Sequence, residues 1–158
     1  MEKVPMTPEG YAALKELLKE KKTEIHKLAK AIGEAAEEGD LKENAEYHAC
    51  RERQGMVKAQ VVDIEDKLAR AEVIDTRRLG GERVAFGAWV TLEDIDNASQ
   101  VTYRIVGADE CDIEKGTISV TSPVARALIN REVGSEVKVK VPGGVRTYEV
   151  VDVAWQEP

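Results

Sequence analysis

Residues 7–35 read TPEGYAALKELLKEKKTEIHKLAKAIGEA, and residues 45–71 read AEYHACRERQGMVKAQVVDIEDKLARA. In both segments apolar residues recur at alternating intervals of three and four, which is the pattern of helices that pack along a common seam. Lys21 interrupts the first series and Gln54 interrupts the second. Two such helices of similar length, joined by a short break, predict an antiparallel coiled-coil hairpin. The predicted seam positions are Tyr11, Leu14, Leu18, Lys21, Ile25, Leu28, Ile32 and Ala35, followed by Tyr47, Cys50, Gln54, Val57, Val61, Ile64, Leu68 and Ala71.

Thr7 and Pro8 mark the start of the first helix. The Thr7 hydroxyl can accept a hydrogen bond from a free backbone N–H, and Pro8 has the backbone φ of the first helical position. With a rise of about 1.5 Å per residue, each arm of about 30 residues would be about 45 Å long. Gly33 inside the first helix costs about 1 kcal/mol relative to Ala, so we expect a hairpin of moderate stability.

The composition of the chain changes between residues 75 and 82. Residues 8–74 are rich in Ala, Leu, Glu and Lys, whereas residues 83–154 are rich in Val, Thr and Gly. A start at Ser122-Pro123 predicts a short helix to about residue 129. We therefore predict an α+β protein of two domains, a coiled-coil hairpin at 1–75 and a small domain with a mostly antiparallel sheet at 76–158. Alternating apolar and polar residues predict strands at 83–92, 101–106, 117–120, 136–141 and 147–153.

The overall composition narrows the possible functions. The 158 residues include 23 basic and 30 acidic side chains, which disfavours tight wrapping of naked nucleic acid because such binding depends on neutralising phosphates. Aromatic residues are only 4%, which disfavours a stacking platform for single strands. Cys50 and Cys111 lie in different halves of the chain and are expected to be reduced thiols. With no long apolar stretch and no signal-peptide pattern, we expect a monomeric cytoplasmic protein with no membrane partner.

Acidic residues gather at the break between the two predicted helices. Residues 34–46 contain six acidic side chains and one Lys, whereas residues 1–33 contain seven Lys and five Glu. The predicted hairpin thus has an acidic tip near residues 39–47. A run of this kind is either a solvated face or a surface that meets a cation or a basic partner.

Asp40 and Glu43 are the most informative pair in this tip. Residues three apart share one face of a helix, and counting back from Tyr47 along the seam places this pair beyond the apolar contact. The same spacing at a helix start is also a capping box, in which Asp40 would accept a hydrogen bond from the N3 amide. Spacing alone leaves both interpretations open.

Two carboxylates do not complete a Mg²⁺ site, because the ion takes about six oxygen ligands. The remaining ligands would have to come from another molecule. His26 and His48 are the only histidines, and the chain has neither a nucleophile–base arrangement nor a GxxxxGK[ST] phosphate loop. The residues therefore favour a probe that carries carboxylates into another molecule's site over a self-contained enzyme.

Residues 39–48, GDLKENAEYH, resemble the tip of the bacterial transcript-cleavage factors of the GreA/GreB family. The resemblance implies a hairpin that enters the secondary channel of RNA polymerase and an FKBP-like C-terminal domain that docks at the channel entrance. It also implies a transcription elongation factor that rescues arrested complexes. Such a factor stimulates the polymerase's own cleavage of the 3′ end of backtracked RNA and is not an enzyme alone. Similarity to the family continues in segments 5–7, 103–107, 118–119, 122–128 and 142–144.

The resemblance also implies roles for individual residues. Asp40 and Glu43 would supply ligands in trans for a second Mg²⁺ shared with the polymerase active site, so no cofactor of the chain's own is expected. A helix cap explains Ser122 and Pro123 equally well, and exposed arginines are common on helices. The other implied roles are positioning of the tip by Asn44, Glu46 and Tyr47, contact with the nascent RNA 3′ end by Arg51 and Arg53, and docking on polymerase by Ser122, Pro123 and Val124.

Two other functions remain open from the sequence. A regulator could occupy the channel without promoting cleavage, although an altered tip would favour that role and this tip motif is intact. The implied FKBP-like fold also suggests a prolyl isomerase or chaperone, but fold alone does not imply function. The aromatic residues of that domain do not obviously line a pocket; they are Phe86, Trp89, Tyr103, Tyr148 and Trp155.

Overall fold

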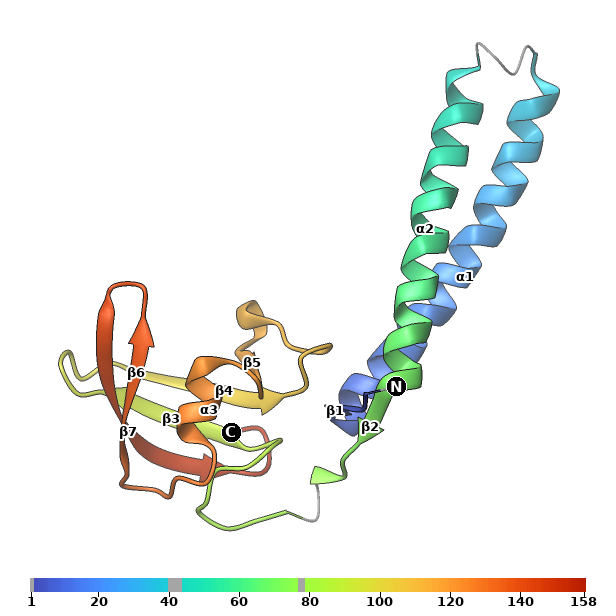
Figure 1. The fold of residues 1–158 in the computed structure, drawn as a ribbon. Helices are drawn as coiled ribbons and strands as arrows, with labels where there is room; N and C mark the ends of the chain where they lie inside the picture. Colours follow the sequence, from blue (N-terminus) through green and yellow to red (C-terminus); the bar gives the residue numbers. More distant parts are fainter. Residues whose placement is uncertain (1, 40–43, 77–78) are drawn as a thin grey trace. The chain divides into compact units, whose positions relative to one another are not determined.

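The computed structural model describes residues 2–39, 44–76 and 79–158, which form two compact units (Figure 1). Tyr11–Arg70 form one unit, and residues 1–10 together with Ala71–Pro158 form the other. This division departs from the predicted boundary at residue 75, because the first ten residues and residues 71–75 group with the sheet. The predicted α+β class is confirmed, with long helices followed by a mostly antiparallel sheet.

The first unit is the helical hairpin. Helix α1 spans Pro8–Glu37 and helix α2 spans Ala45–Arg70, and the two run side by side in opposite directions (Figure 1). Every predicted seam position is at least half-buried, and Ala35, Val57, Val61 and Ile64 are fully buried. The heptad pattern therefore identified the packed faces correctly. Thr7 caps α1 as predicted, because its hydroxyl accepts a hydrogen bond from the Gly10 N–H at 3.0 Å.

The second unit contains a five-stranded sheet with the order β5-β4-β3-β7-β6. Neighbouring strands are antiparallel except β4 and β5, which pair in parallel. The short helix α3, Pro123–Leu128, packs on β6. The strands are β3 (Trp89–Asp94), β4 (Gln100–Val106), β5 (Thr117–Ser119), β6 (Glu136–Val141) and β7 (Gly144–Ala154), with a 3₁₀ turn, η2, at Ile113–Lys115.

The first predicted strand, 83–92, is wrong in its first half. Arg83 forms only an isolated bridge with Glu132, and the strand itself begins at Trp89. Val84 and Ala88 are buried although they lie outside a strand. Their apolar side chains at even positions therefore imitate the alternation of a strand in the sequence. Gly87 interrupts any strand here, because its φ of 87° lies in the left-handed region and its N–H bonds instead to the Ile105 carbonyl at 2.7 Å.

A short pairing was not predicted. Strand β1, Val4–Met6, pairs in parallel with β2, Ala71–Val73, although Ala71 lies 67 positions after Val4 in the sequence. Each strand has three residues, too few to produce a recognisable alternation. This pairing ties the first residues of the chain to the segment that follows α2.

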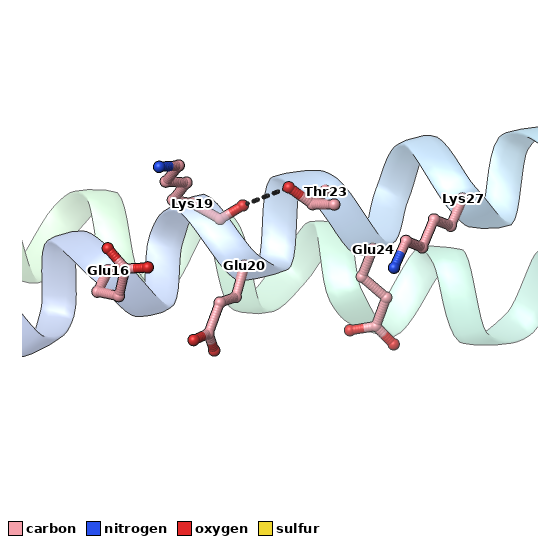
Figure 2. A pocket seen from close by; sticks show the side chains of 6 residues that line it. All are labelled: Glu16, Lys19, Glu20, Thr23, Glu24 and Lys27. Atoms are coloured by element: carbon pink, nitrogen blue, oxygen red, sulfur yellow. Dashed lines mark hydrogen bonds between the residues drawn. The ribbon is translucent and has the colours of Figure 1, made fainter.

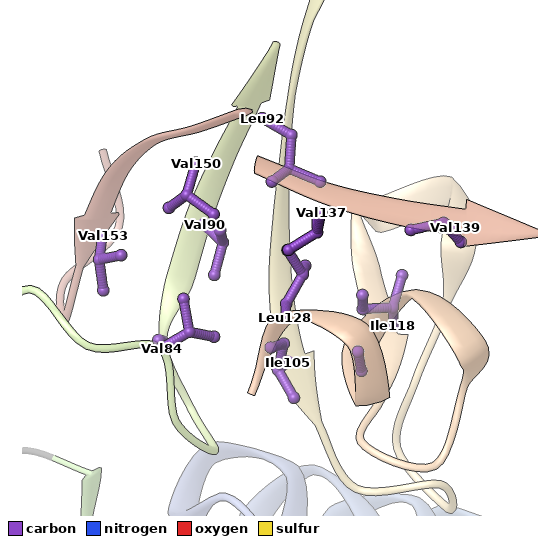
Figure 3. Close-up of a cluster of buried hydrophobic side chains, with 12 residues drawn as sticks. Val84, Val90, Leu92, Ile105, Ile118, Leu128, Val137, Val139, Val150 and Val153 are labelled. Carbon is purple, nitrogen blue, oxygen red and sulfur yellow. The ribbon is translucent and has the colours of Figure 1, made fainter. Parts of the chain in front are cut away.

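Buried aliphatic side chains fill one face of the five-stranded sheet (Figure 3). Leu92 and Ile105 come from the central strands, and Leu128 comes from α3, which covers this face. The burial pattern of β3 alternates between buried and half-buried residues, as expected for a strand with one face on the core. The core is thus small and almost entirely aliphatic.

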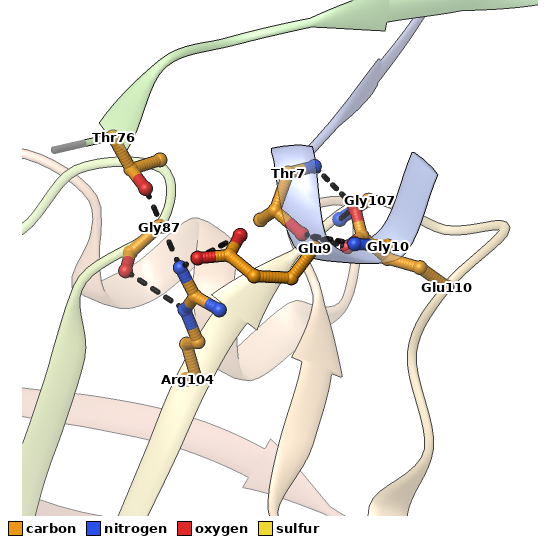
Figure 4. A network of polar contacts seen from close by, with 8 residues as sticks. All are labelled: Thr7, Glu9, Gly10, Thr76, Gly87, Arg104, Gly107 and Glu110. Atoms are coloured by element: carbon orange, nitrogen blue, oxygen red, sulfur yellow. Dashed lines mark hydrogen bonds and ion pairs between the residues drawn. The ribbon is translucent and has the colours of Figure 1, made fainter. Parts of the chain in front are cut away.

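Glu110 organises a polar cluster in the same unit (Figure 4). Its Oε2 accepts hydrogen bonds from the Thr7 N–H at 2.8 Å and the Gly107 N–H at 2.9 Å, and its Oε1 accepts one from the Thr7 hydroxyl. A Cβ at Gly10 would overlap this carboxylate, and a Cβ at Gly107 would overlap the Pro5 carbonyl oxygen. We call Thr7, Gly10, Gly107 and Glu110 the base network. It explains why the start of α1 groups with the sheet.

Within the described residues, no helix is both long enough and apolar enough to cross a membrane.

Candidate functional site

The bend between α1 and α2 is the candidate site, and the structure describes its two flanks. Glu37 ends α1, Glu38 and Gly39 follow it, and Asn44 precedes α2. The predicted carboxylate pair, Asp40 and Glu43, lies outside the described residues. Its assignment to metal binding therefore stays a prediction.

Asn44 joins the two helices at this end of the hairpin. Its Oδ1 accepts a hydrogen bond from the Tyr47 N–H at 3.1 Å, which makes Asn44 the N-cap of α2. Its Nδ2 donates to the Ala35 carbonyl of α1 at 2.7 Å. One side chain thus satisfies a free amide of α2 and gives a second hydrogen bond to the Ala35 carbonyl, which also accepts from the Glu38 N–H at 3.2 Å.

This geometry bears on the alternative role of Asp40. A capping box for the second helix would start that helix at residue 41, whereas α2 begins at Ala45. The cap position of α2 belongs to Asn44. The acidic pair is therefore not needed to cap this helix.

The next turn of α2 brings Tyr47 and Arg51 together. An Arg51 N–H donates to the Tyr47 hydroxyl at 3.0 Å, and the guanidinium lies 5.8 Å from the centre of the Tyr47 ring. The His48 ring meets Tyr47 edge to face, with ring centres 5.4 Å apart. Glu46 is exposed on the same turn. Of the predicted tip residues, the structure brings Tyr47 and Arg51 into direct contact.

Arg53 has a different environment from Arg51. Its guanidinium forms an ion pair with Glu24 of α1, at 2.8 Å from the Nη2 atom and 2.9 Å from Nε. Lys21, the polar interruption of the first seam, lies 3.9 Å from the same carboxylate. Arg53 therefore links the two helices in this structure, while its predicted contact with RNA remains a prediction.

The predicted docking residues lie at the start of α3. The Ser122 hydroxyl accepts a hydrogen bond from the Ala125 N–H at 3.2 Å, and Pro123 occupies the first helical position. Val124 is half-buried against the sheet core. The capping interpretation of Ser122 and Pro123 is thus correct, and the docking role is an additional prediction that these contacts leave untested.

A recess on each of the two units was not predicted from the sequence. One, of about 410 Å³, follows the surface of α1 (Figure 2). It is lined by both signs of charge, so it resembles a hydrated helix surface. The other, of about 240 Å³, lies in the sheet unit around Arg104, whose guanidinium is 5.4 Å from the Trp89 ring and donates to the Gly87 carbonyl at 3.1 Å (Figure 4). The first recess is lined by Glu16, Lys19, Glu20, Thr23, Glu24 and Lys27.

In the parts of the chain that the structure describes, no three His, Cys, Asp or Glu side chains gather closely enough to hold a metal ion. Cys50 is half-buried and Cys111 is exposed, and both are free thiols. The described geometry and the sequence of the bend together define the class: an α+β protein whose helical hairpin carries a charged, acidic bend.

Comparison with known proteins identifies the family. The profile for the N-terminal part of transcription elongation factors matches residues 4–73, and the profile for the C-terminal part of GreA/GreB factors matches residues 79–154. The chain is 55% identical over 156 residues to transcription elongation factor GreA of Phenylobacterium zucineum, covering 98% of this chain and 99% of that one. It is 52% identical over 157 residues to GreA of Hyphomonas neptunium, covering 99% and 100%. The chain belongs to the GreA/GreB family of transcription elongation factors, which confirms the resemblance of the tip motif.

Solved structures are also similar to this chain. The crystal structure of GreA factor homolog 1 of Thermus thermophilus is 25% identical in sequence, with a TM-score of 0.45, over 97% of this chain and 99% of that chain.

Proposed function

We propose that this protein binds RNA polymerase, inserts its hairpin into the secondary channel and stimulates the polymerase's Mg²⁺-dependent cleavage of the 3′ end of backtracked RNA. The observation that carries the proposal is the intact motif of residues 39–48 at the bend of the hairpin, in a chain that matches its family over both domains. The sheet unit docks at the rim of the channel. The protein acts in the cytoplasm, on the complex that holds the nascent RNA.

The shape of the hairpin supports this mode of action. Helix α1 has 30 residues and is about 45 Å long at about 1.5 Å per residue. Its packed seam is narrow, most of its other positions are exposed, and more than half of those exposed positions carry charged side chains. A slender rod with a charged surface can reach deep into a hydrated channel without burying apolar surface there.

Asp40 and Glu43 are the residues that we assign to the metal. Mg²⁺ prefers carboxylate oxygen and commonly combines one or two carboxylates with water and substrate phosphate, so a pair from this chain fits such a shared site. When bound, the ion would activate water or stabilise the leaving oxygen in phosphodiester hydrolysis. The chain's own contribution is to hold two carboxylates at the end of a rod. Asn44 supports this role because it caps α2, so the cap of that helix requires neither carboxylate.

Other tip residues serve positioning and RNA contact in this proposal. Tyr47 and Arg51 hold each other, so the Arg51 guanidinium is fixed near the tip and can meet the phosphates of the extruded RNA. Glu46 helps to position the tip, and Arg53 is the second candidate for RNA contact. Ser122, Pro123 and Val124 form the docking segment on the sheet unit.

The test uses a stalled, backtracked elongation complex with end-labelled RNA. We expect the wild-type protein to accelerate 3′-end cleavage, and Asp40→Asn or Glu43→Gln to bind equally well but to cleave about tenfold more slowly or worse. Because the substitutions remove charge and keep shape, raised Mg²⁺ should partly restore the rate. Glu37→Gln is the matched control, since it removes an exposed carboxylate from the end of α1 and should retain stimulation.

Two results would contradict the proposal. If the wild-type protein binds polymerase and cleavage does not rise, the protein is a regulator that occupies the channel. If all three variants lose activity equally, general negative charge at the bend matters and the specific pair does not.

A further inference from the structure

The recess around Arg104 has no role in the proposed function. Its volume is about 240 Å³, and its described lining lies entirely within the sheet unit. The lining combines this guanidinium with the rings of Trp89 and Trp155 and with the exposed carboxylates of Glu9 and Glu157. Sites for small ligands are commonly concave and aromatic with a few polar groups, although most are larger, at about 300–1,000 Å³. This recess therefore has room for one ring with a small substituent.

Contacts within the sheet unit hold the Arg104 side chain in place. The side chain is 12% exposed, and the guanidinium lies 5.4 Å from the centre of the Trp89 ring, its partner on the neighbouring strand β3. The Nε atom donates to the Gly87 carbonyl at 3.1 Å, and Nη2 lies 3.4 Å from the Thr76 hydroxyl. A group fixed in this way loses little conformational freedom when a ligand binds to it.

Part of the Arg104 guanidinium is left without a close partner. Among the described residues, Nη1 has no hydrogen-bond acceptor, and no dashed line reaches it in Figure 4. The Glu9 carboxylate lies 3.8 Å from Nη2, which is too long for a hydrogen bond. The Glu9 side chain is 61% exposed, so water screens this ion pair and the carboxylate can turn away at little cost. The charge of Arg104 is therefore only loosely paired.

Arg104 determines which charge the recess favours in a ligand. It is the least exposed charged group of the described lining, whereas Glu9 and Glu157 are exposed. Water and salt screen exposed charges strongly and largely buried charges much less. The N–H groups of a guanidinium also match the two oxygens of a carboxylate. An incoming carboxylate would thus take the place of the Glu9 carboxylate.

The aromatic wall selects the group to which that carboxylate is attached. The Trp155 indole N–H donates to the Gly81 carbonyl at 3.0 Å, which fixes the ring and satisfies its polar atom. The rest of the ring is an apolar surface on which a flat apolar group can pack. We propose that the recess binds a small carboxylic acid, whose carboxylate pairs with Arg104 in place of Glu9 and whose flat apolar group packs against Trp155. This inference goes beyond the proposed function, because the ligand belongs to the sheet unit and its binding does not require polymerase.

The experiment titrates the isotope-labelled full chain with benzoate and follows the two indole N–H signals by nuclear magnetic resonance. The chain has two tryptophans and both line the recess, so these signals report on it directly. We expect saturable shifts with a dissociation constant on the order of 1 mM, as for other ligands of one ring. Benzamide keeps the shape without the charge, and acetate keeps the charge without the ring. Each should bind about tenfold more weakly than benzoate.

Two variants test the charged residues of the recess. Glu9→Gln removes the competing carboxylate and should tighten benzoate binding about threefold. Arg104→Lys keeps the charge but loses the fork that matches a carboxylate, so it should weaken binding about tenfold. Glu114→Gln is the matched control, since it removes an exposed carboxylate from the 3₁₀ turn η2 of the same unit and should leave the affinity unchanged.

Several results would overturn the proposal. Benzoate may give no saturable shift, or benzamide or acetate may bind as tightly as benzoate; either result excludes a site for an apolar carboxylic acid. Equal affinities of Glu9→Gln and Glu114→Gln for benzoate would show that Glu9 does not compete for Arg104. The comparison of the three ligands uses the wild-type protein, so it decides the matter even if Arg104→Lys is less stable.

Discussion

The bend of the hairpin and the base network use the same arrangement in different surroundings. In each, the residue that caps a helix makes a second hydrogen bond to another segment: Thr7 to Glu110, and Asn44 to Ala35. Thr7 is 1% exposed and its partner is a carboxylate, whereas Asn44 is half-buried and its partner is a neutral carbonyl. Hydrogen bonds to charged groups contribute more than neutral ones. The base network should therefore matter most for stability, and the bend for function.

The largest effect is expected when the base network loses its carboxylate. Glu110→Ala would leave the Thr7 N–H, the Thr7 hydroxyl and the Gly107 N–H without their acceptor. We expect the free energy of unfolding of the sheet unit to fall by about 3 kcal/mol. Both tryptophans, Trp89 and Trp155, lie in this unit, so tryptophan fluorescence during urea unfolding measures it directly.

The control for this experiment is Glu114→Ala, which removes an exposed carboxylate from the neighbouring 3₁₀ turn. Its unfolding midpoint should stay close to that of the wild type. If the Glu110 and Glu114 variants unfold at the same urea concentration, the base network does not stabilise the unit and the comparison with the bend fails.

Substituting alanine for one glycine in each region tests the same comparison. The substitution near the bend is expected to stabilise the protein, by less than Glu110→Ala destabilises it. A Cβ at Gly107 would overlap the Pro5 carbonyl, whereas a Cβ at Gly33, in the part of α1 near the bend, would meet nothing within 4 Å. Gly33→Ala should stabilise the hairpin by about 1 kcal/mol, because Ala has the higher helix propensity. Thermal melting followed by circular dichroism at a helix wavelength should show a higher midpoint. Gly107→Ala should be destabilising, and a lower midpoint for Gly33→Ala would show that the glycine serves some other purpose.

The hairpin could be predicted in detail because its pattern is local and repeated. The seam from Tyr11 to Ala71 repeats one spacing over about 60 residues, so a single irregular position such as Lys21 does not hide it. The caps at Thr7 and Ser122 were also predictable, since each depends on residues within one helical turn. The motif at the bend identified the family for the same reason: it is contiguous in sequence.

Contacts between distant segments could not be predicted in this way. Glu110 bonds to Thr7 across 103 positions, and nothing in either local sequence marks the pair. The pairing of β1 with β2 has the same character. Asn44 is intermediate: its role as a cap follows from residue type, but its bond to Ala35 depends on how closely two helix ends approach. At the candidate site, the acidic residues could therefore be identified from the sequence. The hydrogen bond between the two flanks could be identified only from the structure.

The smallest expected effect on stability concerns the ion pair between Glu24 and Arg53, which lies between the two regions compared. Its side chains are 32% and 44% exposed, so a double-mutant cycle of Glu24→Gln and Arg53→Gln should give a coupling energy of about 0.5 kcal/mol or less. The two single variants differ more usefully in cleavage assays. If Arg53 contacts the RNA 3′ end, Arg53→Gln should reduce cleavage, while Glu24→Gln releases the guanidinium and should preserve or raise it. Equal effects of the two variants would mean that Arg53 acts only as a link between the helices, because each substitution breaks that link to the same extent. The RNA contact at the tip would then be assigned to Arg51, whose guanidinium is held by Tyr47 on its own helix and does not depend on α1.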